Sequence, residues 1–441
     1  MHQNLTTPEP SLDPHRPPIP ATPLPDLLDP AWLRELALAC GADAAGVVEV
    51  EREALKGDAA AMEAMLPGVK SVVSLLARVN ADALRGPWMG VANRSARFAE
   101  EGVDRAASEL SRRLQQAGLR SVAVHASFPM DVHREGRIWP LAHKVLAEQA
   151  GLGTRGHNRL LLHPEFGAAV VLAAVLVDRP AAGTSAPLER SPCNGCGLCV
   201  EACPTGAIGK DGAFSLVNCA AHNYRFRLGG FNAWVETLVD SRDRRDYRKR
   251  VRPEETMGIW QSLTTGANHA CMNCMAVCPV GQGRPKPPAP RGKDLVRQLL
   301  DRGGQIHVIR GSDAEVHARA RFQPERIRIV SSGNRLTTAR GFLQALPILF
   351  QPGQAEGLEV AVHFEFTGAD PCGATAILSQ GRLRVAPGLE GNPDVTVMAD
   401  GPTWVAIASG LKGILPAILT RKLRLRGSRK AFRAFMRCFP S

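Results

Sequence analysis

The stretch Cys193-Asn-Gly-Cys196-Gly-Leu-Cys199-Val-Glu-Ala-Cys203-Pro204 decides how the middle of this chain folds. Its cysteines follow the spacing Cys-x2-Cys-x2-Cys-x3-Cys-Pro, which is the pattern of thiolate ligands to a [4Fe–4S] cluster. Three thiolates two residues apart on a curled loop can reach three corners of one cubane. The fourth follows a longer gap, precedes a proline, and ligates a different cluster. The spacing therefore predicts a second run of cysteines elsewhere in the chain.

A second run is present at Cys271-Met-Asn-Cys274-Met-Ala-Val-Cys278-Pro279, with the spacing Cys-x2-Cys-x3-Cys-Pro. It lacks the first cysteine of the pattern, because Asn268 stands at that position. Cys219 is the one unassigned cysteine between the two runs, and it is the natural substitute. We therefore predict two [4Fe–4S] clusters held by eight thiolates. The predicted ligands are Cys193, Cys196, Cys199 and Cys278 for the first cluster, and Cys203, Cys219, Cys271 and Cys274 for the second.

Two other uses of paired cysteines fit the sequence less well. Disulfides need an oxidising compartment, and nothing in the sequence indicates export. Zinc sites of four cysteines also use Cys-x2-Cys pairs, but the x2-x2-x3-Pro rhythm fits zinc poorly. The remaining cysteines, Cys40, Cys372 and Cys438, have no assignable partners and are expected to be ordinary thiols.

The composition is that of a multidomain protein with a real core. The chain has 441 residues, 44% of them hydrophobic and 22% charged, enough for two or three domains. No run of about 18 apolar residues occurs, so no transmembrane helix is expected. Residues 1–25 are rich in proline and polar side chains, with neither a basic start nor an apolar stretch. We interpret them as a disordered tail rather than a signal peptide, and expect a cytoplasmic protein whose thiols stay reduced.

The net charge of +12 raises the question of an anionic partner. The excess is arginine spread along a chain rich in alanine and glycine, which favours an arginine-biased solvated surface. The densest basic run, from Arg242 to Arg252, is interrupted by Asp243 and Asp246. We therefore do not expect nucleic acid as a partner.

Segments typical of helices and strands alternate over the first 180 residues. A helix is predicted after Asp29, with an aspartate N-cap, Pro30 at its first position and Gly41 as its stop. Further helices are expected up to residues 66–68 and over 93–118 and 140–150, from the spacing of apolar residues. Strands are expected at 45–50, 71–77, 121–125, 159–163 and 168–178. This alternation predicts an α/β domain over residues 26–182.

A glycine-rich segment, Gly151-Leu-Gly153-Thr-Arg-Gly156, matches the dinucleotide pattern Gly-x-Gly-x-x-Gly. A dinucleotide loop follows a strand and opens a helix. This one follows a predicted helix and precedes a predicted strand, so the order is reversed. A glycine stop at the end of a helix is the better interpretation.

The stretch from Ala150 to Gly167, the Cys-Pro-Thr-Gly-Ala-Ile ending of the first cysteine run and the lone Cys219 together resemble the epoxyqueuosine reductase and reductive dehalogenase superfamily. The resemblance covers residues 30–282. It implies a corrinoid-binding α/β domain beside a ferredoxin-like domain over residues 183–282. It also implies that the glycine loop binds the corrinoid, cobalamin, if one is used. The residues implied to bind the cofactor are Gly151, Gly153, Gly156 and Asn158.

Three positions depart from that family's pattern. Arg137 stands where epoxyqueuosine reductases carry the aspartate proposed as proton donor, and His157 stands where they carry a lysine. The stretch between Cys219 and Cys271 is also longer. The candidate proton donors by chemistry, each of which could instead be an ordinary surface or core residue, are Asp131, His133, His143 and His157. Because histidine titrates near neutral pH, His143 and His157 are the predicted catalytic residues.

The last part of the chain resembles a sterol carrier protein domain. A proline-rich linker at 281–292 and a connector over 283–334 precede it. Over 335–441 the predicted order is strands, two helices, a strand and a last helix, with a hairpin across Ser379-Gln-Gly381. The resemblance, carried by segments such as Lys422-Leu-Arg-Leu-Arg-Gly427, implies an α+β fold with an apolar tunnel for lipids. Six apolar residues could line the tunnel or simply form core: Val405, Ile407, Ile414, Leu415, Ile418 and Leu419.

Three functions follow as hypotheses. The first is an iron–sulfur oxidoreductase that takes electrons from a low-potential donor of the ferredoxin or flavodoxin type and passes them to a corrinoid or an apolar substrate or lipid. The second is a non-catalytic electron carrier docked by a lipid-binding domain, which a filled amino-terminal domain without a cavity would favour. The third is reduction of epoxyqueuosine in tRNA.

Overall fold

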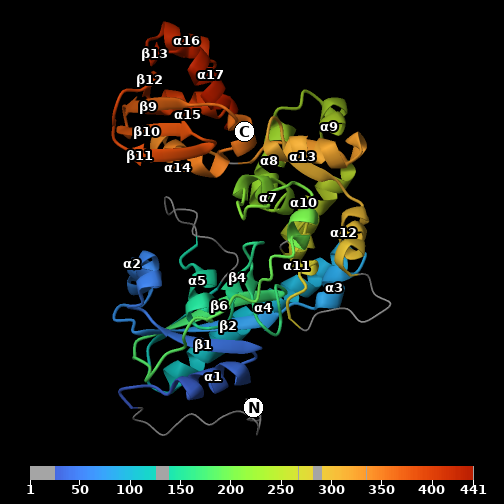
Figure 1. Cartoon of the computed structure of the whole chain (residues 1–441), viewed down its shortest axis with the longest axis vertical. Coiled ribbons are helices and arrows are strands. Elements are labelled where there is room, and N and C mark those ends of the chain that lie inside the picture. The colour runs from blue at the N-terminus through green and yellow to red at the C-terminus, as the bar shows by residue number, and fades with distance from the viewer. Residues whose placement is uncertain (1–24, 126–138, 267, 282–290, 334, 441) are drawn as a thin grey trace, which may run out of the picture.

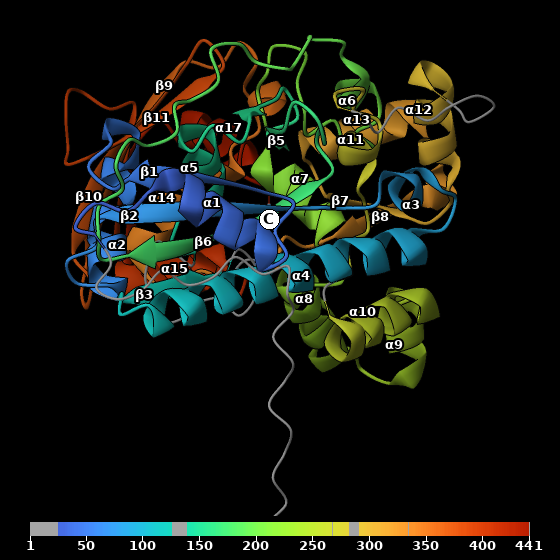
Figure 2. The same cartoon turned by 90° about the horizontal axis from the view of Figure 1, so that it is seen from below.

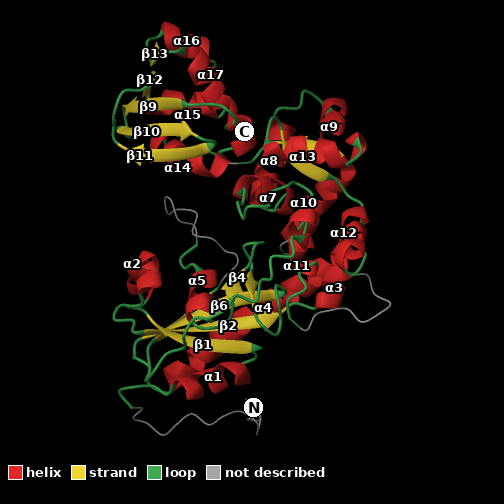
Figure 3. Ribbon diagram, viewed as in Figure 1, coloured by secondary structure: helices red, strands yellow, loops and turns green. Residues whose placement is uncertain are grey.

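In the computed structural model the chain forms a long molecule with one sheet at each end and short helices between them (Figures 1 and 3). The structure describes residues 25–125, 139–266, 268–281, 291–333 and 335–440. The predicted tail up to residue 24 and most of the proline-rich linker lie outside these ranges. The same is true of Asp131, His133 and Arg137. No helix in the described part of the chain is long and apolar enough to span a lipid bilayer.

The amino-terminal sheet has the strand order β1-β2-β6-β3, and each neighbouring pair is antiparallel. Its pairing sets Val47 opposite Val73 and Val73 opposite Val175. A small antiparallel hairpin, β4–β5, follows the predicted glycine stop. The strands are β1 Ala44–Glu49, β2 Ser71–Arg78, β3 Ser121–Val124, β4 Thr154–Arg155, β5 Leu161–Leu162 and β6 Val170–Val177.

Helices cover both faces of this sheet. Valines 73 and 175 point to the face of α1 and α4, whereas their neighbours Val72 and Leu176 point to the face of α2 and α5. This alternation follows from the period of two in a strand. Figure 2 shows α1 and α4 lying across the near face. The predicted α/β layer is therefore confirmed. The helices are α1 Pro30–Ala39, η1 Glu53–Leu55, α2 Lys56–Met65, α3 Ala81–Arg85, α4 Met89–Gln116 and α5 His143–Gln149.

The middle of the molecule is made of short helices. The two cysteine runs form α6 and α11, which share one apolar core with Ala92 and Ala96 of α4 and with Leu295 and Leu299 of α12. Three helices that the sequence analysis did not predict, α8 to α10, fill the stretch between Cys219 and Cys271. The helices are α6 Leu198–Glu201, α7 Leu216–Asn223, α8 Leu228–Val239, α9 Arg244–Arg250, α10 Pro253–Thr265, α11 Asn273–Ala276 and α12 Gly292–Asp301.

The connector after the linker is an ordered βαβ unit. Its strands β7 (Ile306–Ile309) and β8 (Ile327–Val330) are parallel, with Val308 opposite Ile329. Helix α13 (Asp313–Arg321) and the short turn η2 (Pro324–Arg326) join them. The division of the chain into domains stays a prediction, since apolar cores extend across the predicted boundaries.

The carboxyl-terminal sheet has the order β11-β10-β9-β12-β13, with β9 and β12 parallel and the other pairs antiparallel. Gln380 and Gly381 both have positive φ, which is the conformation of the predicted two-stranded hairpin turn. The α+β order is therefore confirmed. The elements are α14 Ala339–Leu349, η3 Pro352–Ala355, β9 Val360–Thr367, β10 Cys372–Ser379, β11 Arg382–Pro387, β12 Val395–Asp400, α15 Gly401–Ala408, α16 Ile414–Leu419, β13 Leu423–Gly427 and α17 Arg429–Arg437.

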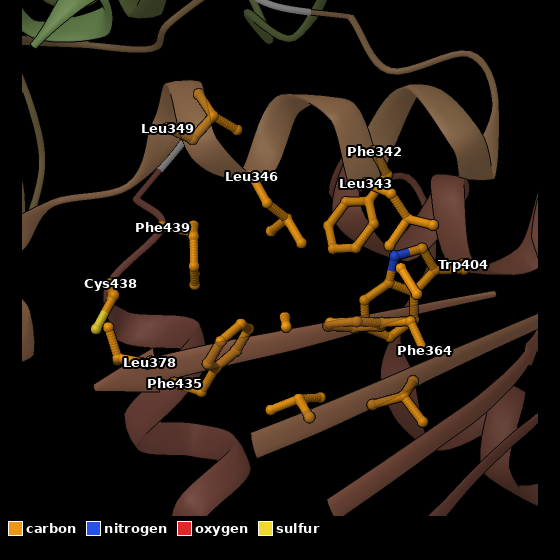
Figure 4. Close-up of a cluster of buried hydrophobic side chains, with 14 of the residues drawn as sticks. Phe342, Leu343, Leu346, Leu349, Phe364, Leu378, Trp404, Phe435, Cys438 and Phe439 are labelled. Carbon is orange, nitrogen blue, oxygen red and sulfur yellow. The ribbon is translucent and has the colours of Figure 1, made fainter. Parts of the chain in front are cut away.

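Aromatic rings fill the interior of this domain (Figure 4). Phe364 is fully buried, and its ring centre lies 5.9 Å from that of Trp404 and 6.1 Å from that of Phe435. Phe342 stacks edge-on to Trp404 at 5.2 Å. The prediction that α16 residues line a tunnel or form core is wrong, because Ile414, Leu415, Ile418 and Leu419 are exposed.

Candidate functional site

The first predicted set of thiols comes together in space. Cys193, Cys196, Cys199 and Cys278 line one small hollow at the surface of the middle region. The loop between them turns tightly because Gly195 and Gly197 have φ of 68° and 73°, values that side chains other than glycine rarely adopt. The structure thus brings the fourth ligand from the second cysteine run to the first, as the spacing predicts. The assignment of these cysteines as ligands stays a prediction.

The second predicted set is buried deeper. Cys203 lies near enough to Cys219, Cys271 and Cys274 for negative charge on its sulfur to raise the pKa of those three thiols. Burial is the larger cause, and it raises the pKa of Cys219 and of Cys271 to about 12. Cys219, which stands outside both runs, is therefore placed beside the cysteines that it was predicted to join.

This donor set fits an iron–sulfur cubane better than a single metal ion. In the described residues, no three His, Cys, Asp or Glu side chains lie close enough to hold one ion. A cubane places iron and sulfide between its thiolates, so its ligands stand farther apart than those of zinc. Thiols this deeply buried ionise only against strong positive charge, which bound iron supplies.

The glycine loop packs the amino-terminal domain against its surroundings. A Cβ atom on Gly153 would clash with the carbonyl oxygen of Leu162, and one on Gly156 would clash with the Leu162 side chain. Gly151 has φ of 73° and approaches the backbone at Ala186 in the same way. These contacts give the glycines a packing role, and their role in cofactor binding stays a prediction.

Asn158 and His157 point to the cysteine loops. The side-chain amide of Asn158 donates a hydrogen bond to the carbonyl oxygen of Cys274 at 3.1 Å. The Nε2 atom of His157 lies 2.7 Å from the carbonyl oxygen of Gly209. Both residues also line the hollow at Cys193. The structure therefore separates the two predicted catalytic histidines, since His143 lies elsewhere.

His143 lines a cavity of about 550 Å³ between the amino-terminal sheet and the middle helices. Burial lowers the pKa of His143 to about 4, although a hydrogen bond with the backbone of His125 acts to raise it. The imidazole is thus neutral at pH 7. The cavity is lined by Glu100, Val103, Asp104, Trp139, Leu141, Ala142, His143, Lys144, Val145, Arg155, Leu160, Leu161, Val170, Val171, Leu172, Tyr224, Arg227 and His269.

Two acids in this cavity were missed by the sequence analysis. Glu100 and Asp104 stand one turn apart on α4 and both face the cavity. Burial raises the pKa of Asp104, and the imidazole of His125, whose Nδ1 atom lies 3.2 Å from the carboxyl group, acts to lower it. Burial also acts to raise the pKa of Glu100, but His269, Arg227 and Arg97 together bring it below its usual value. Two carboxyl groups with pKa values pushed apart are typical of acid–base sites. The sequence pattern that could have revealed them is a pair of acids four residues apart on a predicted helix, each next to a buried apolar residue, Ala99 and Val103.

Two residues that line the cavity are close in sequence to cysteines of the second set. Tyr224 ends α7, which carries Cys219, and His269 precedes Cys271 by two residues. Two groups that line the cavity are the ammonium of Lys144 and the hydroxyl of Tyr224. Burial lowers the pKa of Lys144 and raises that of Tyr224, and negative charge on Cys219 and Cys274 acts to raise both. Residues close in sequence to the second predicted cluster thus form part of the cavity wall.

A second cavity, of about 590 Å³, adjoins the first and shares Trp139, Tyr224 and Arg227 with it. It lies between the middle helices and α14 of the carboxyl-terminal domain. Its other lining is mainly apolar, including Leu216, Leu336 and Ile348, and two of its arginines are neutralised: Arg225 by Glu255 and Arg335 by Glu236. This second cavity therefore suits an apolar group.

Two family models match the chain: "4Fe-4S binding domain" at residues 188–209, and "SCP-2 sterol transfer family" at residues 352–440. The epoxyqueuosine reductase of Synechococcus sp. (strain CC9605) is 39% identical over 113 residues, which are 23% of this chain and 35% of that protein. That of Aliivibrio fischeri (strain ATCC 700601 / ES114) is 30% identical over 140 residues, 32% of this chain and 30% of that protein. The chain thus spans about a third of the length of these relatives.

Solved structures are similar at a lower level. An epoxyqueuosine reductase solved with an epoxyqueuosine-modified tRNA stem loop is 19% identical, with a TM-score of 0.34 over 57% of this chain and 65% of that chain. The catabolic reductive dehalogenase NpRdhA is 15% identical, with a TM-score of 0.36 over 65% of this chain and 35% of that chain. By its cysteine pattern and the matched sequences, the chain is similar to epoxyqueuosine reductases over about a third of their length, carries a 4Fe-4S binding domain at residues 188–209, and matches the SCP-2 sterol transfer family over residues 352–440.

Proposed function

We propose that this protein is an iron–sulfur reductase whose substrate or corrinoid occupies the 550 Å³ cavity. The observation that carries the proposal is the position of this cavity, because residues flanking the second cysteine set form part of its wall. Two [4Fe–4S] clusters, when bound, supply electrons one at a time. An electron carrier needs no such cavity, so its presence favours the reductase over the carrier.

The two cysteine sets support a direction for the electrons. Cys196 of the first set is exposed, whereas Cys271 and Cys274 of the second set are less accessible. Cys199 of the first set is close enough to affect the pKa of Cys274. A low-potential ferredoxin or flavodoxin would therefore dock near Cys196, and the substrate would receive electrons from the second set.

Asp104 is the proton donor in this proposal. Its carboxyl group lines the cavity, and burial raises its pKa, so it holds a proton more readily than an exposed aspartate. His143 faces the same cavity as a neutral imidazole and would orient the bound molecule by hydrogen bonding. The adjoining apolar cavity would accept an apolar part of the substrate.

The test begins with anaerobic purification, elemental analysis for iron and cobalt, and identification of small molecules that co-purify. About eight irons per chain are expected for two cubanes. Added cobalamin whose absorption spectrum shifts on binding would assign a corrinoid to the cavity. Val171→Trp, which puts an indole into the cavity wall, should abolish binding or turnover with the iron content unchanged. Turnover that survives this change would overturn the proposal.

A matched pair of variants tests the proton donor. Asp104→Asn removes the acid, and Glu101→Gln changes a carboxylate on the same helix that pairs with Arg97 and does not line the cavity. We expect turnover by Asp104→Asn to fall by about 10²-fold or more, as is usual when a general acid is lost. Equal activities of the two variants would remove Asp104 from the mechanism.

A second candidate is reduction of a modified nucleoside in tRNA. The matched relatives are named epoxyqueuosine reductases, so the expectation that nucleic acid is no partner finds no support. Binding to phosphates weakens steeply with salt. Retention of tRNA at low ionic strength that is lost near 0.2 M salt, together with conversion of epoxyqueuosine, would establish this candidate. Absence of both would leave a different substrate for the cavity.

A further inference from the structure

Helix α16 carries its apolar side chains on the outside of the protein. Leu411, just before the helix, is 84% exposed, Leu415 is 73% exposed and Leu419 is 83% exposed. Ile414 and Ile418 join them on the surface, and the small Ala417 is the residue that packs inward. A surface helix normally turns its apolar stripe to the core. A contiguous patch of this kind marks a site of interaction.

The chain around this patch is strongly basic. Residues 401–441 contain nine lysines and arginines and no aspartate or glutamate. On β13, Arg424 and Arg426 are exposed, alternating with the buried Leu423. The ion pairs of this domain, Arg340–Asp370 and Arg384–Glu390, involve other residues. The cations are Lys412, Arg421, Lys422, Arg424, Arg426, Arg429, Lys430, Arg433 and Arg437.

The patch lies at the tip of the molecule. Figure 1 shows α16 at the far end of the long axis, beside β13 and α17 and away from the amino-terminal sheet. A flat surface can therefore reach it without meeting the rest of the chain. Most of the net charge of +12 is concentrated in this last segment rather than spread evenly along the chain.

The positive charge and the aliphatic side chains of the patch favour one kind of binding partner over the others. A second copy would bring the same cations face to face, which is repulsive. Single-stranded nucleic acid is bound by exposed aromatic rings together with cations, whereas Trp404 and Phe435 are buried here and the exposed side chains are aliphatic. Aliphatic residues ringed by lysine and arginine are the composition of a segment that lies in the interface of an anionic bilayer.

We propose that Leu411, Leu415 and Leu419, with the surrounding cations, dock this protein on the surface of an anionic phospholipid bilayer. The leucines enter the boundary between headgroups and acyl chains, and the arginines contact lipid phosphates. The carboxyl-terminal domain thereby holds the reductase at a membrane, where an apolar substrate would be concentrated.

The experiment is co-sedimentation of the full, iron-loaded chain with vesicles. Equal mixtures of phosphatidylglycerol and phosphatidylcholine should bind the protein, and vesicles of phosphatidylcholine alone should bind it at least tenfold more weakly. The double variant Leu415→Glu/Leu419→Glu should lose binding. The control Val239→Glu alters a 77% exposed valine on α8 and should bind normally. The double variant should keep its iron and its turnover, which separates this proposal from that of the reductase.

The charge contribution is measured separately. Arg424→Gln/Arg426→Gln should weaken binding by about 25-fold at low salt, since each cation near an anionic surface contributes a factor of about five. Equal binding to both vesicles, or full binding by the leucine variant, would overturn the proposal. A dimer that only the leucine variant abolishes would assign the patch to a second copy. Retention of tRNA that only the leucine variant loses would assign it to nucleic acid.

Discussion

The amino-terminal and carboxyl-terminal sheets differ in what lies beside their cores. The amino-terminal sheet leaves a cavity between β6 and the middle helices, lined by two acids, two histidines and residues close in sequence to the second cysteine set. Aromatic rings pack on the carboxyl-terminal sheet and fill the core of that domain. Its exposed apolar side chains, such as Leu415 and Leu419, lie on α16. We therefore propose redox chemistry for the first region and surface contact for the second. Four substitutions test this contrast between the two regions.

Removal of a ligand from the second cysteine set should have the largest effect. Cys271→Ala is expected to lower the iron content from about eight to about four per chain, because only the first cubane keeps four thiolates. Electron transfer to a molecule in the cavity should stop. Iron analysis and electron paramagnetic resonance of the reduced protein measure both. Cys40→Ala, which changes a cysteine of α1's C-cap, is the control and should keep all its iron.

Removal of an aromatic ring from the filled core should unfold the carboxyl-terminal domain readily. Phe364→Ala is expected to cost about 3–5 kcal/mol, because it leaves a cavity among Phe342, Trp404 and Phe435. Urea denaturation followed by tryptophan fluorescence measures the change. The control Leu419→Ala, at an 83% exposed position, should change stability by about 0.5 kcal/mol at most. Comparable costs for the two would contradict the filled-core description.

The packing role of the glycine loop predicts an intermediate effect. Gly153→Ala should destabilise the amino-terminal domain by about 2 kcal/mol, because its new methyl group meets the backbone of Leu162. Gly57→Ala, within helix α2 and with open space around it, should instead stabilise by about 0.5 kcal/mol. Thermal unfolding compares them. If Gly153→Ala kept normal stability but lost cobalamin binding, the loop would hold a cofactor as the resemblance implies.

The buried His143 predicts a pH dependence of stability. Its pKa is lowered from 6.5 to about 4, so the unfolded chain binds a proton more readily than the folded one. Stability contributed by the neutral imidazole is full above pH 6.5 and is lost as pH falls toward 4. Between pH 7 and pH 5 the loss should be about 2 kcal/mol. His143→Gln should remove this part of the pH dependence, and urea denaturation at the two pH values would show it.

Much of the fold followed from local patterns. The cap at Asp29, the valine-rich strand at Val72 and Val73, and the turn at Gly381 each act through their own neighbours, so their elements were predicted correctly. The helices between Cys219 and Cys271 were not predicted, and neither was the exposure of Leu415 and Leu419. The spacing of apolar residues predicts that a helix has one apolar face, but it does not predict whether that face packs on the core or faces solvent.

The sequence alone predicted the thiolate chemistry, because the spacing of Cys193, Cys196 and Cys199 suits the reach of three sulfurs on one loop to one cubane. It also predicted the alternation of helices and strands at the two ends of the chain. The folded structure was needed to show that Asp104 and His143 share a cavity and that α16 faces outward. Those facts depend on contacts between residues far apart in the chain, which no local pattern encodes.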